Sequence, residues 1–384
     1  MAVRHGYGKI AGADALVFAY DTGDTRNSYR GEPTTNLALN PTFSSTTNWS
    51  LASNGGGSFS TANNIGKITA GSAGSYSYLY QTVNTTVASN ESLTWSVEFK
   101  NNVVGGFAIR IVLFLNGTVK TQPVAYVSLD GTGGTVRKSV TTSHADGANS
   151  VRIDVLQGSY YSGLTDTDAE FFNAQLERNS HATPFTAGTR SATQGLLDLT
   201  GRNTVDLTNA SYNSSAQVDF DGTTDLITVT GYKLSTTDGT QPYTIEAVIK
   251  RGGGSSAGGI ITQYRTSVDA PDRFGFREMS PGYLSWWKGG NIAIGSSIMP
   301  TGVYLHIVGT KAADGSVTVY QNGEVIATGT DTRVFEDEDI QIGAFGSGIA
   351  HFDGEIPVTK IYNRALTANE VRNNYNQYKG RFNI

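Results

Sequence analysis

Apolar and polar residues alternate with a period of two through much of the chain. Between residues 93 and 99 every second side chain is apolar: Leu93, Trp95, Val97 and Phe99. Thr94, Ser96 and Glu98 fall on the opposite face. Because successive side chains of a strand point to opposite faces of its sheet, this pattern predicts a half-buried antiparallel strand.

The segment 151–155 alternates in the same way and places Arg152 and Asp154 on its polar face. Gly, Ser, Thr and Asn separate such runs, as is typical of antiparallel sheets with many turns. Ala313–Gly315 and Gln321–Gly323 are predicted two-residue hairpin turns. Further strands are predicted over residues 14–20, 76–80, 107–115, 124–129, 171–176, 217–220, 226–229, 243–250, 259–264, 273–277, 283–287, 304–311, 316–321, 339–343 and 355–362.

A short helix is predicted close to the C-terminus. Thr367–Glu370 has the spacing of a capping box, in which two side chains satisfy the free N–H groups of the first turn. Val371, Tyr375 and Tyr378 then recur at roughly helical spacing, and Gly380 is expected to end the helix.

Composition favours an all-β protein and excludes several other classes. With 46 glycines and only 16% charged residues, the chain has few of the residues that build long helices. We therefore expect two antiparallel β-sandwich (jelly-roll) domains and one short C-terminal helix. The absence of cysteine excludes disulfide scaffolds and cysteine-based metal or redox sites.

Charge and hydropathy narrow the expected partners. The net charge of -5 gives little to neutralise a phosphate backbone, so we expect no nucleic-acid partner. No segment approaches the roughly 20 apolar residues of a membrane helix, so we expect no membrane insertion. The first residues lack the apolar stretch of a signal peptide, so we expect the protein to fold in a cytoplasm or to leave it by a route other than a cleaved signal.

Several segments after residue 215 carry a family resemblance: Val218–Asp225, Tyr304–Thr310, Val319–Gly323 and Phe352–Val371. Together they resemble the laminin-G/concanavalin A-like domains that are common in phage and environmental proteins. The closing segment Asn374–Phe382 is similar to the tail of many phage structural members. The resemblance implies a β-sandwich and a place on a phage particle, and it names no ligand.

The order of the segments suggests an inserted domain. In the phage relatives, a strand like Ala15–Asp21 and a turn like Ser28–Gly31 run straight into an Asp-Leu-Ser/Thr-Gly segment. Here the counterpart, Asp198–Gly201, follows much later. We expect one discontinuous sandwich of residues 13–35 plus 190–384, an inserted domain at 36–189, and an N-terminal arm at 1–12 that anchors the chain. The alternative is two sequential sandwiches with 1–35 as a separate arm.

The central segment carries a second resemblance. Asn36–Phe43 with Trp49 matches the opening of the group-four/nine carbohydrate-binding modules, and Phe171–Glu177 with Ala182–Phe185 matches their close. The resemblance implies a jelly roll over about 36–187 and a structural Ca²⁺. Ser44 and Asn173 stand where those modules commonly have a carboxylate, and Ca²⁺ prefers charged oxygens, so we expect no cofactor and leave the structural Ca²⁺ in doubt.

Acidic residues that could serve catalysis occur at Glu336–Asp339. Glycosidases need two carboxyl groups that project together into a cleft. No apolar alternation interleaves this run, so it is better interpreted as a solvated loop that leads into the strand 339–343. The five histidines show no metal-ligand spacing. We therefore expect no enzyme and no catalytic or metal-binding residue.

Aromatic residues form the candidate ligand sites. Tyr76 and Tyr78 share a strand face with Tyr80, and Tyr160 and Tyr161 fall in a loop. Tyr283 with Trp286 and Trp287 makes a dense aromatic segment, and alternation places the two adjacent tryptophans on opposite faces. The competing interpretation is that these rings are ordinary core or interface residues.

The resemblances together imply a virion surface protein that binds glycans weakly and in many copies. It would be a head decoration, a fibre or a tail component, assembled in the host cytoplasm with other virion proteins. We expect a homo-oligomer, and trimers are common among such appendages. One alternative is a purely structural decoration subunit without a glycan ligand. Another is a polysaccharide depolymerase that uses Glu336 or Glu338.

Overall fold

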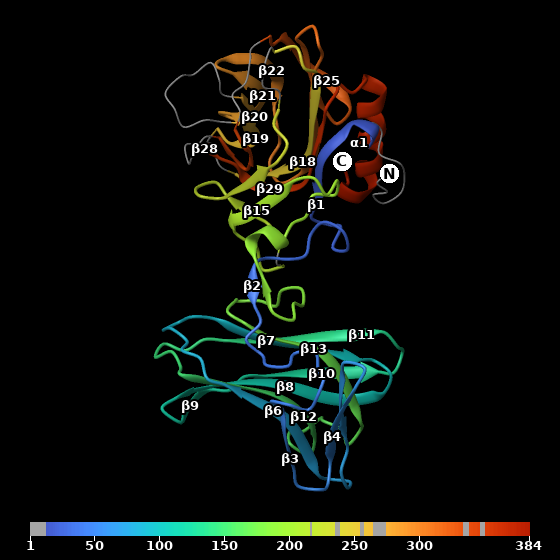
Figure 1. The fold of residues 1–384 in the computed structure, drawn as a ribbon, viewed down its shortest axis with the longest axis vertical. Coiled ribbons are helices and arrows are strands. Elements are labelled where there is room, and N and C mark those ends of the chain that lie inside the picture. Colours follow the sequence, from blue (N-terminus) through green and yellow to red (C-terminus); the bar gives the residue numbers. More distant parts are fainter. Residues whose placement is uncertain are drawn as a thin grey trace. The chain divides into compact units, whose positions relative to one another are not determined.

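The computed structural model describes residues 13–215, 217–234, 239–253, 257–263, 274–332, 338–345 and 350–384. The proposed N-terminal arm, 1–12, and Glu336 lie outside these residues. The regular secondary structure of the described chain consists almost entirely of antiparallel strands, with the helix α1 at Ala368–Phe382, so the predicted all-β class is confirmed (Figure 1). Short 3-10 turns occur at Ala13–Ala15 and Ala192–Gln194.

The chain divides into two compact units. Unit 1 consists of Met1–Pro33 with Ser191–Ile384, and unit 2 consists of Thr34–Arg190. The first strand, β1 (Leu16–Asp21), belongs to unit 1, because it pairs with β29 (Asp353–Tyr362) from Leu16 opposite Tyr362 to Asp21 opposite Val358.

In unit 1, one sheet has the strand order β1-β29-β18-β23-β24-β25, with β16 beside β29. The other has the order β15-β17-β26-β19-β20-β21-β22. Large apolar side chains such as Phe18, Ile245 and Trp286 fill the core. The remaining strands of the unit are β15 (Thr204–Asn209), β16 (Phe220–Asp221), β17 (Leu226–Thr230), β18 (Tyr243–Arg251), β19 (Gly259–Gln263), β20 (Phe274–Met279), β21 (Tyr283–Lys288), β22 (Asn291–Ile298), β23 (Tyr304–Lys311), β24 (Ser316–Gln321), β25 (Glu324–Thr330), β26 (Ile340–Ile342), β27 (Ala344–Phe345) and β28 (Ala350–His351).

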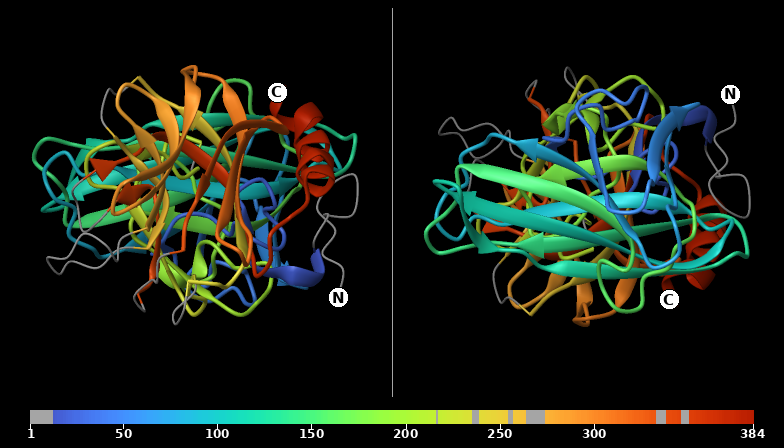
Figure 2. Two further views of the ribbon diagram at one scale, coloured as in Figure 1. Left: turned by 90° about the horizontal axis from the view of Figure 1, so that it is seen from above. Right: turned by 90° about the horizontal axis from the view of Figure 1, so that it is seen from below.

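The helix α1 covers the outer face of the β1-β29-β18-β23 region, beside which it lies in both views of Figure 2. Its capping box is present as predicted, with Thr367 at the N-cap and Glu370 reaching back. The predicted end at Gly380 is wrong. The helix continues to Phe382 and ends at Asn383, which adopts the left-handed conformation and donates its N–H to the Lys379 carbonyl.

A buried polar cluster joins α1 to the sheet. Glu246 of β18 accepts hydrogen bonds from the Tyr362 hydroxyl at 2.8 Å and from the Asn374 amide of α1 at 2.9 Å. His306 Nε2 lies 3.1 Å from its other oxygen, and Lys360 Nζ lies 3.6 Å away. Burial alone would raise the pKa of Glu246, but the attraction of Lys360 and the hydrogen bond with His306 lower it to about 2.

Unit 2 is a sandwich of a sheet ordered β10-β8-β12-β6-β3, with β9 beside β8, and a sheet ordered β11-β7-β13-β5-β4. The two sheets form distinct layers in Figure 1. Their inner faces meet in a core that includes Trp95, Phe107 and Ile153. The strands are β2 (Thr34–Thr35), β3 (Ser50–Ser53), β4 (Ser58–Ala62), β5 (Ile65–Thr69), β6 (Tyr76–Val83), β7 (Leu93–Lys100), β8 (Val104–Leu115), β9 (Thr118–Thr121), β10 (Val124–Asp130), β11 (Thr135–Thr142), β12 (Ser150–Gly158), β13 (Ala169–Glu177) and β14 (Thr189–Arg190).

Strand β7 is not half-buried as predicted. Thr94 and Ser96, on its polar face, are 0% exposed. The Thr94 hydroxyl bonds to the Asn179 carbonyl, and Ser96 accepts a hydrogen bond from Arg137. The prediction failed because a later part of the chain covers this face.

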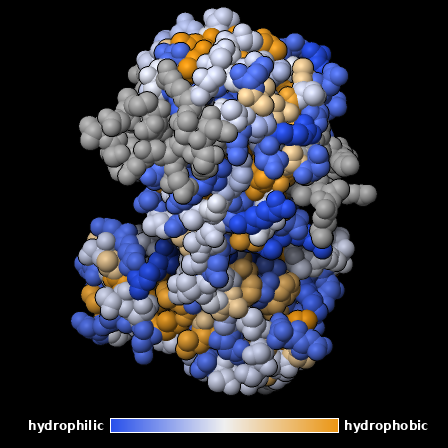
Figure 3. Space-filling view, turned by 45° about the horizontal axis from the view of Figure 1, so that its top comes forward, coloured by the Kyte–Doolittle hydropathy of each residue, from blue (hydrophilic) through white to orange (hydrophobic). Residues whose placement is uncertain are grey.

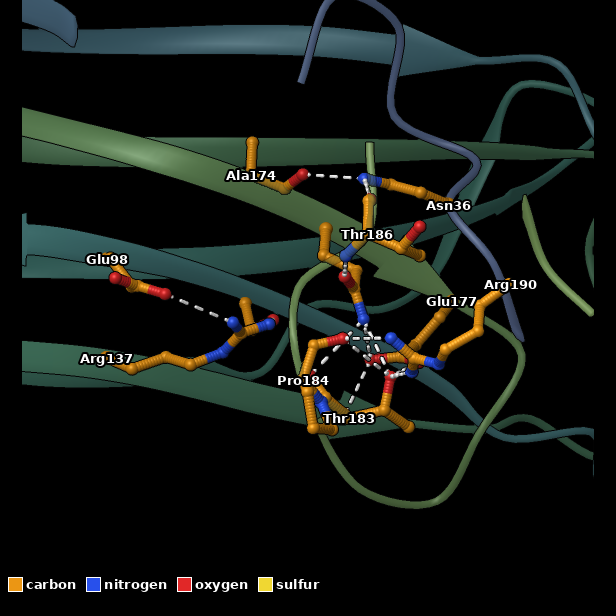
Figure 4. A network of polar contacts seen from close by, with 11 residues as sticks. Asn36, Glu98, Arg137, Ala174, Glu177, Thr183, Pro184, Thr186 and Arg190 are labelled. Carbon is orange, nitrogen blue, oxygen red and sulfur yellow. Dashed lines mark hydrogen bonds and ion pairs between the residues drawn. The ribbon is translucent and has the colours of Figure 1, made fainter. Parts of the chain in front are cut away.

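That covering segment is held by a polar network around Glu177 (Figure 4). Thr183 donates to Glu177 through its N–H at 2.9 Å and its hydroxyl at 2.7 Å. Arg190 donates to the Thr183 hydroxyl and the Pro184 carbonyl. Asn36 bonds to the carbonyls of Ala174 and Thr186. The network therefore fastens the first and last segments of unit 2 to one sheet.

The visible surface in Figure 3 is mostly hydrophilic, with small apolar patches. The large apolar side chains exposed among the described residues are Leu39, Val104, Val119, Tyr126, Ile294, Ile298, Val303 and Val325. None of the described helices is both long and apolar enough to span a membrane.

Candidate functional site

A row of tyrosines covers the outer face of the β10-β8-β12-β6-β3 sheet. Tyr76, Tyr78 and Tyr80 alternate along β6 and therefore point the same way. The ring centroids of Tyr76 and Tyr78 are 6.2 Å apart, and those of Tyr78 and Tyr80 are 5.6 Å apart. The three rings are half-buried, so part of each still faces solvent.

The loop after β12 brings Tyr160 and Tyr161 over the same face. The Tyr160 ring lies edge-on to Tyr76 at 5.4 Å and to Tyr78 at 5.2 Å. Gly158 makes the turn possible, since its φ is +71° and a Cβ there would lie 2.2 Å from the Ser75 carbonyl oxygen. The sequence therefore places a tyrosine-bearing loop beside a tyrosine-bearing strand.

Tyr126 of β10 completes this surface from the other side. Its ring lies 6.3 Å from Tyr161 and its side chain is 51% exposed. We use the term tyrosine face for this surface, which consists of Tyr76, Tyr78, Tyr80, Tyr126, Tyr160 and Tyr161.

A buried ion pair lies beneath the tyrosine face. Strand register places Asp154 of β12 between Arg110 of β8 and Tyr80 of β6. Arg110 Nε lies 2.5 Å from Asp154 Oδ2, and Arg152 Nε lies 3.0 Å from Asp154 Oδ1. Arg110 Nη1 also donates to the Tyr160 hydroxyl at 3.0 Å. The pair thus fixes the position of the tyrosine loop.

The electrostatics of this cluster follow from its burial. Burial raises the pKa of the Asp154 carboxyl, against the opposing effect of Arg110 and Arg152. Burial also raises the pKa of the Tyr78 hydroxyl, so this ring is neutral at physiological pH. The face therefore presents hydroxyl groups and aromatic rings over a buried ion pair. Such surfaces suit ligands with both apolar faces and hydroxyl groups.

The structure separates the second group of candidates. Trp286 lies in the core of unit 1 at 0% exposure, with its indole N–H bonded to Asp331 at 3.0 Å. This burial removes Trp286 from the candidate ligand contacts, because β21 turns every second side chain inward. Trp287 and Tyr283 point outward and are half-buried.

Tyr126 in the tyrosine face and Arg110 beneath it were not among the residues picked out from the sequence. Arg110 is the charged residue within the otherwise apolar segment 107–115, whereas Asp154 shares the polar face of 151–155 with Arg152. A charge in an otherwise apolar strand is a usable signal, since buried charges require partners. Tyr126 gives a weaker signal, because any alternating strand can carry an outward tyrosine.

The acidic segment is described in part. Asp339 is paired with Lys233 at 3.2 Å and accepts from the Thr230 hydroxyl. Glu336 falls outside the described residues. Among the residues that the structure describes, no group of three or more His, Asp or Glu side chains could hold a metal ion.

The resemblance to carbohydrate-binding modules implies a structural Ca²⁺, but Ser44 and Asn173 do not fit a Ca²⁺ site. The Ser44 N–H and hydroxyl both donate to Asn40 Oδ1. Asn173, which adopts a φ of +53°, lies in a β-bulge of β13 and supplies no carboxylate.

Comparisons with solved structures give distant partial matches. The tailspike protein 4 of bacteriophage CBA120 matches at 13% identity and a TM-score of 0.31, over 37% of this chain and 21% of that one. The botulinum neurotoxin serotype G binding domain matches at 15% identity and a TM-score of 0.38, over 47% of this chain and 48% of that one. Domain 4 of the arabinanase AbnA from Geobacillus stearothermophilus, in complex with arabinotriose, matches at 18% identity and a TM-score of 0.33. The match covers 48% of this chain and 93% of that one.

The chain thus spans about a fifth of the tailspike and half of the toxin domain. No curated protein sequence matches it. A family model does match residues 221–372, that of the concanavalin A-like lectin/glucanases superfamily. These residues include the strands from β17 to β29 and the start of α1. The matched residues of unit 1 are therefore similar to concanavalin A-like lectin/glucanase domains.

Proposed function

We propose that this protein is a non-enzymatic glycan-binding protein and that the tyrosine face of unit 2 is its binding surface. The observation that carries the proposal is the convergence of tyrosines from β6, β10 and the 160–161 loop over the Arg110–Asp154 pair. Pyranose rings have apolar C–H faces that pack on aromatic rings, and the phenol hydroxyls bond to sugar hydroxyls.

A binding role is favoured over catalysis by the state of Asp154. Both of its oxygens face guanidinium groups, one from Arg110 and one from Arg152. Hydrolysis of a glycosidic bond needs one carboxyl to protonate the leaving group and a second to act as base or nucleophile. A carboxylate fixed between two arginines is poorly suited to either role.

We further propose that the protein is displayed on a bacteriophage particle, as a head decoration, fibre or tail component assembled in the host cytoplasm. The support is the likeness of Phe352–Val371 and Asn374–Phe382 to phage structural proteins. Many copies on one particle would compensate for a shallow single site through avidity. A homo-oligomer is part of this proposal.

A glycan array with the full chain tests the proposal. We expect binding of a defined glycan class, weakened about tenfold by Tyr78→Ala or Tyr160→Ala, which is about 1.4 kcal/mol. Tyr160→Phe, which keeps the ring, should retain more of the binding than Tyr160→Ala. Absence of binding to glycans in a multivalent display would favour a purely structural decoration subunit. Antibody labelling of purified particles tests the virion location separately.

A further inference from the structure

The outer face of the second sheet of unit 1 holds an aromatic and cationic cluster. Trp287 of β21 and Phe345 of β27 meet edge to face at 5.0 Å. The guanidinium carbon of Arg277, from β20, lies 4.9 Å from the centroid of each ring. We use the term tryptophan–arginine face for Arg277, Trp287 and Phe345.

Strand register explains why these residues come together. Gly275 lies opposite Trp287 on the neighbouring strand, and a Cβ at Gly275 would lie 2.6 Å from the Phe345 ring. The missing side chain therefore makes the space that Phe345 occupies. Thr262 and Gln341 continue the same row across β19 and β26, so polar groups flank the rings.

Arg277 is a cation without a carboxylate partner among the described residues. No hydrogen bond or ion pair joins its guanidinium to them, and its Nε is buried without an acceptor. Burial lowers the pKa of Arg277, and no acidic group of the described chain offsets that effect. An arginine in this state has guanidinium hydrogen-bonding capacity that the described protein leaves unused.

The residue that follows Arg277 on β20 is acidic, but its side chain does not point towards Arg277. Glu278 faces the opposite side of β20 and is ion-paired with Arg251, which also donates to the Met299 carbonyl. The charge of Arg251 is therefore compensated by Glu278, whereas no carboxylate of the described residues compensates the charge of Arg277. A half-buried cation that contacts two aromatic rings and has no counter-ion is suited to a ligand that brings its own.

We propose that the tryptophan–arginine face binds a carboxylate-bearing saccharide, such as a uronic acid unit of an acidic polysaccharide. The sugar ring packs on Trp287 and its carboxylate accepts hydrogen bonds from Arg277, which offers a planar fork matched to a carboxylate. The net charge of -5 disfavours a highly sulfated polyanion, which would need a broad basic patch. This site is carried by observations independent of the tyrosine face.

Tryptophan fluorescence can report on this face specifically. The chain has four tryptophans, and Trp49, Trp95 and Trp286 are 7%, 0% and 0% exposed. Trp287 is the half-buried one, so we expect it to account for most of the quenching by added acrylamide. The full chain is titrated with hexagalacturonate, and with the same oligomer after reduction of its carboxyl groups. Protection of Trp287 from acrylamide is measured at each step.

We expect saturable protection with hexagalacturonate and at least tenfold weaker binding of the reduced oligomer. Arg277→Gln should weaken binding of hexagalacturonate by about tenfold or more, the scale of a lost charge-assisted hydrogen bond. Arg277→Lys, which keeps the charge, should recover part of it. Trp287→Phe should abolish the fluorescence change and leave a measurable affinity by calorimetry.

Three outcomes would overturn the proposal: equal protection by the reduced oligomer, tighter binding of a heparin hexasaccharide than of hexagalacturonate, or unchanged binding in Arg277→Gln. Tyr78→Ala serves as the control for the other surface, because it alters the tyrosine face and leaves Trp287 untouched. Acidic-sugar binding that survives Tyr78→Ala but fails in Arg277→Gln separates this site from the proposed function. Loss in Tyr78→Ala alone would overturn this site while supporting the other.

Discussion

Arg110 and Asp154 form an ion pair that is almost wholly removed from solvent, with Nε and Oδ2 2.5 Å apart and side chains 3% and 0% exposed. The two residues come from neighbouring strands and meet directly opposite each other in the register of β8 and β12. The same guanidinium bonds to Tyr160, so one contact couples the stability of unit 2 to the order of the tyrosine face.

Removal of one partner of this pair should be costly. We expect Arg110→Met to lower the free energy of unfolding of unit 2 by about 3–5 kcal/mol, because it leaves Asp154 buried without its main counter-charge. The double variant Arg110→Met with Asp154→Leu should recover much of that loss. Urea unfolding, monitored by hydrogen exchange of the β8 and β12 amides, measures the free energy of unfolding of the single and the double variant.

Arg152 supplies the control, since it also contacts Asp154 but its side chain is 25% exposed. Arg152→Met should cost clearly less than Arg110→Met. Equal losses for the two variants would mean that the burial of Arg110 does not set the cost.

Acid should weaken the attachment of α1 to its sheet through Glu246. Its pKa in the folded protein is about 2, below the ordinary value of 4.5, so the folded state favours the ionised carboxylate. The resulting stabilisation is complete above pH 4.5 and is lost as the pH falls towards 2, with a total of about 3 kcal/mol. Thermal unfolding of unit 1 measured between pH 6 and pH 2 should show this loss.

Glu246→Gln should make the stability of unit 1 less dependent on pH in that window, at the expense of lower stability at neutral pH. The groups that face Glu246 are Lys360 of β29, His306 of β23, and Tyr362 and Tyr378. An unchanged pH profile in Glu246→Gln would assign the acid sensitivity to another carboxylate.

Gly343 should tolerate no side chain. Its φ is +84°, and a Cβ would lie 2.0 Å from the Phe220 ring. We expect Gly343→Ala to lower the free energy of unfolding by more than about 3 kcal/mol, through backbone strain plus overpacking. Gly201→Ala is the matched control, because its φ is +69° with open space around it. It should show only the strain, about 1 kcal/mol, in the same thermal unfolding experiment.

The helix cap can be tested at a single side chain. Thr367 accepts a hydrogen bond from the Glu370 N–H, and Glu370 reaches back to Thr367. Thr367→Ala should reduce stability by about 1 kcal/mol and increase hydrogen exchange in the first turn of α1. Thr367→Ser keeps the hydroxyl and should behave like the parent protein, whereas a comparable loss in both variants would argue against the cap.

The hairpin turns depend on the residues within them, so the sequence of each turn could predict its position. Asn322 and Gly323 both adopt positive φ in the predicted two-residue turn between β24 and β25. The turn at Asp314 is longer than predicted, since Ala312 pairs with Ser316 and Gly315 takes the left-handed position. The dipeptide sequence alone does not distinguish these two loop lengths, because Asp-Gly suits either.

The parts that the sequence did not predict depend on distant segments. Thr94 is buried where its hydroxyl meets the Asn179 carbonyl, and Ser96 is buried where it accepts a hydrogen bond from Arg137. The candidate site shows the same limit. Alternation identifies the tyrosines of β6 as one row, but only the register of β8 against β12 brings Arg110 to Asp154. Trp286 and Trp287 were correctly assigned to opposite faces, since that follows from the geometry of one strand.

The pairing of β1 with β29 has a consequence for synthesis. Leu16 emerges from the ribosome long before Tyr362, its partner in the sheet. Unit 2 is complete in the nascent chain by Arg190, whereas the edge of β1 is covered only after β29 has been synthesised. We expect unit 2 to acquire protease resistance before β29 has been synthesised, and unit 1 to do so only after β29 has left the ribosome.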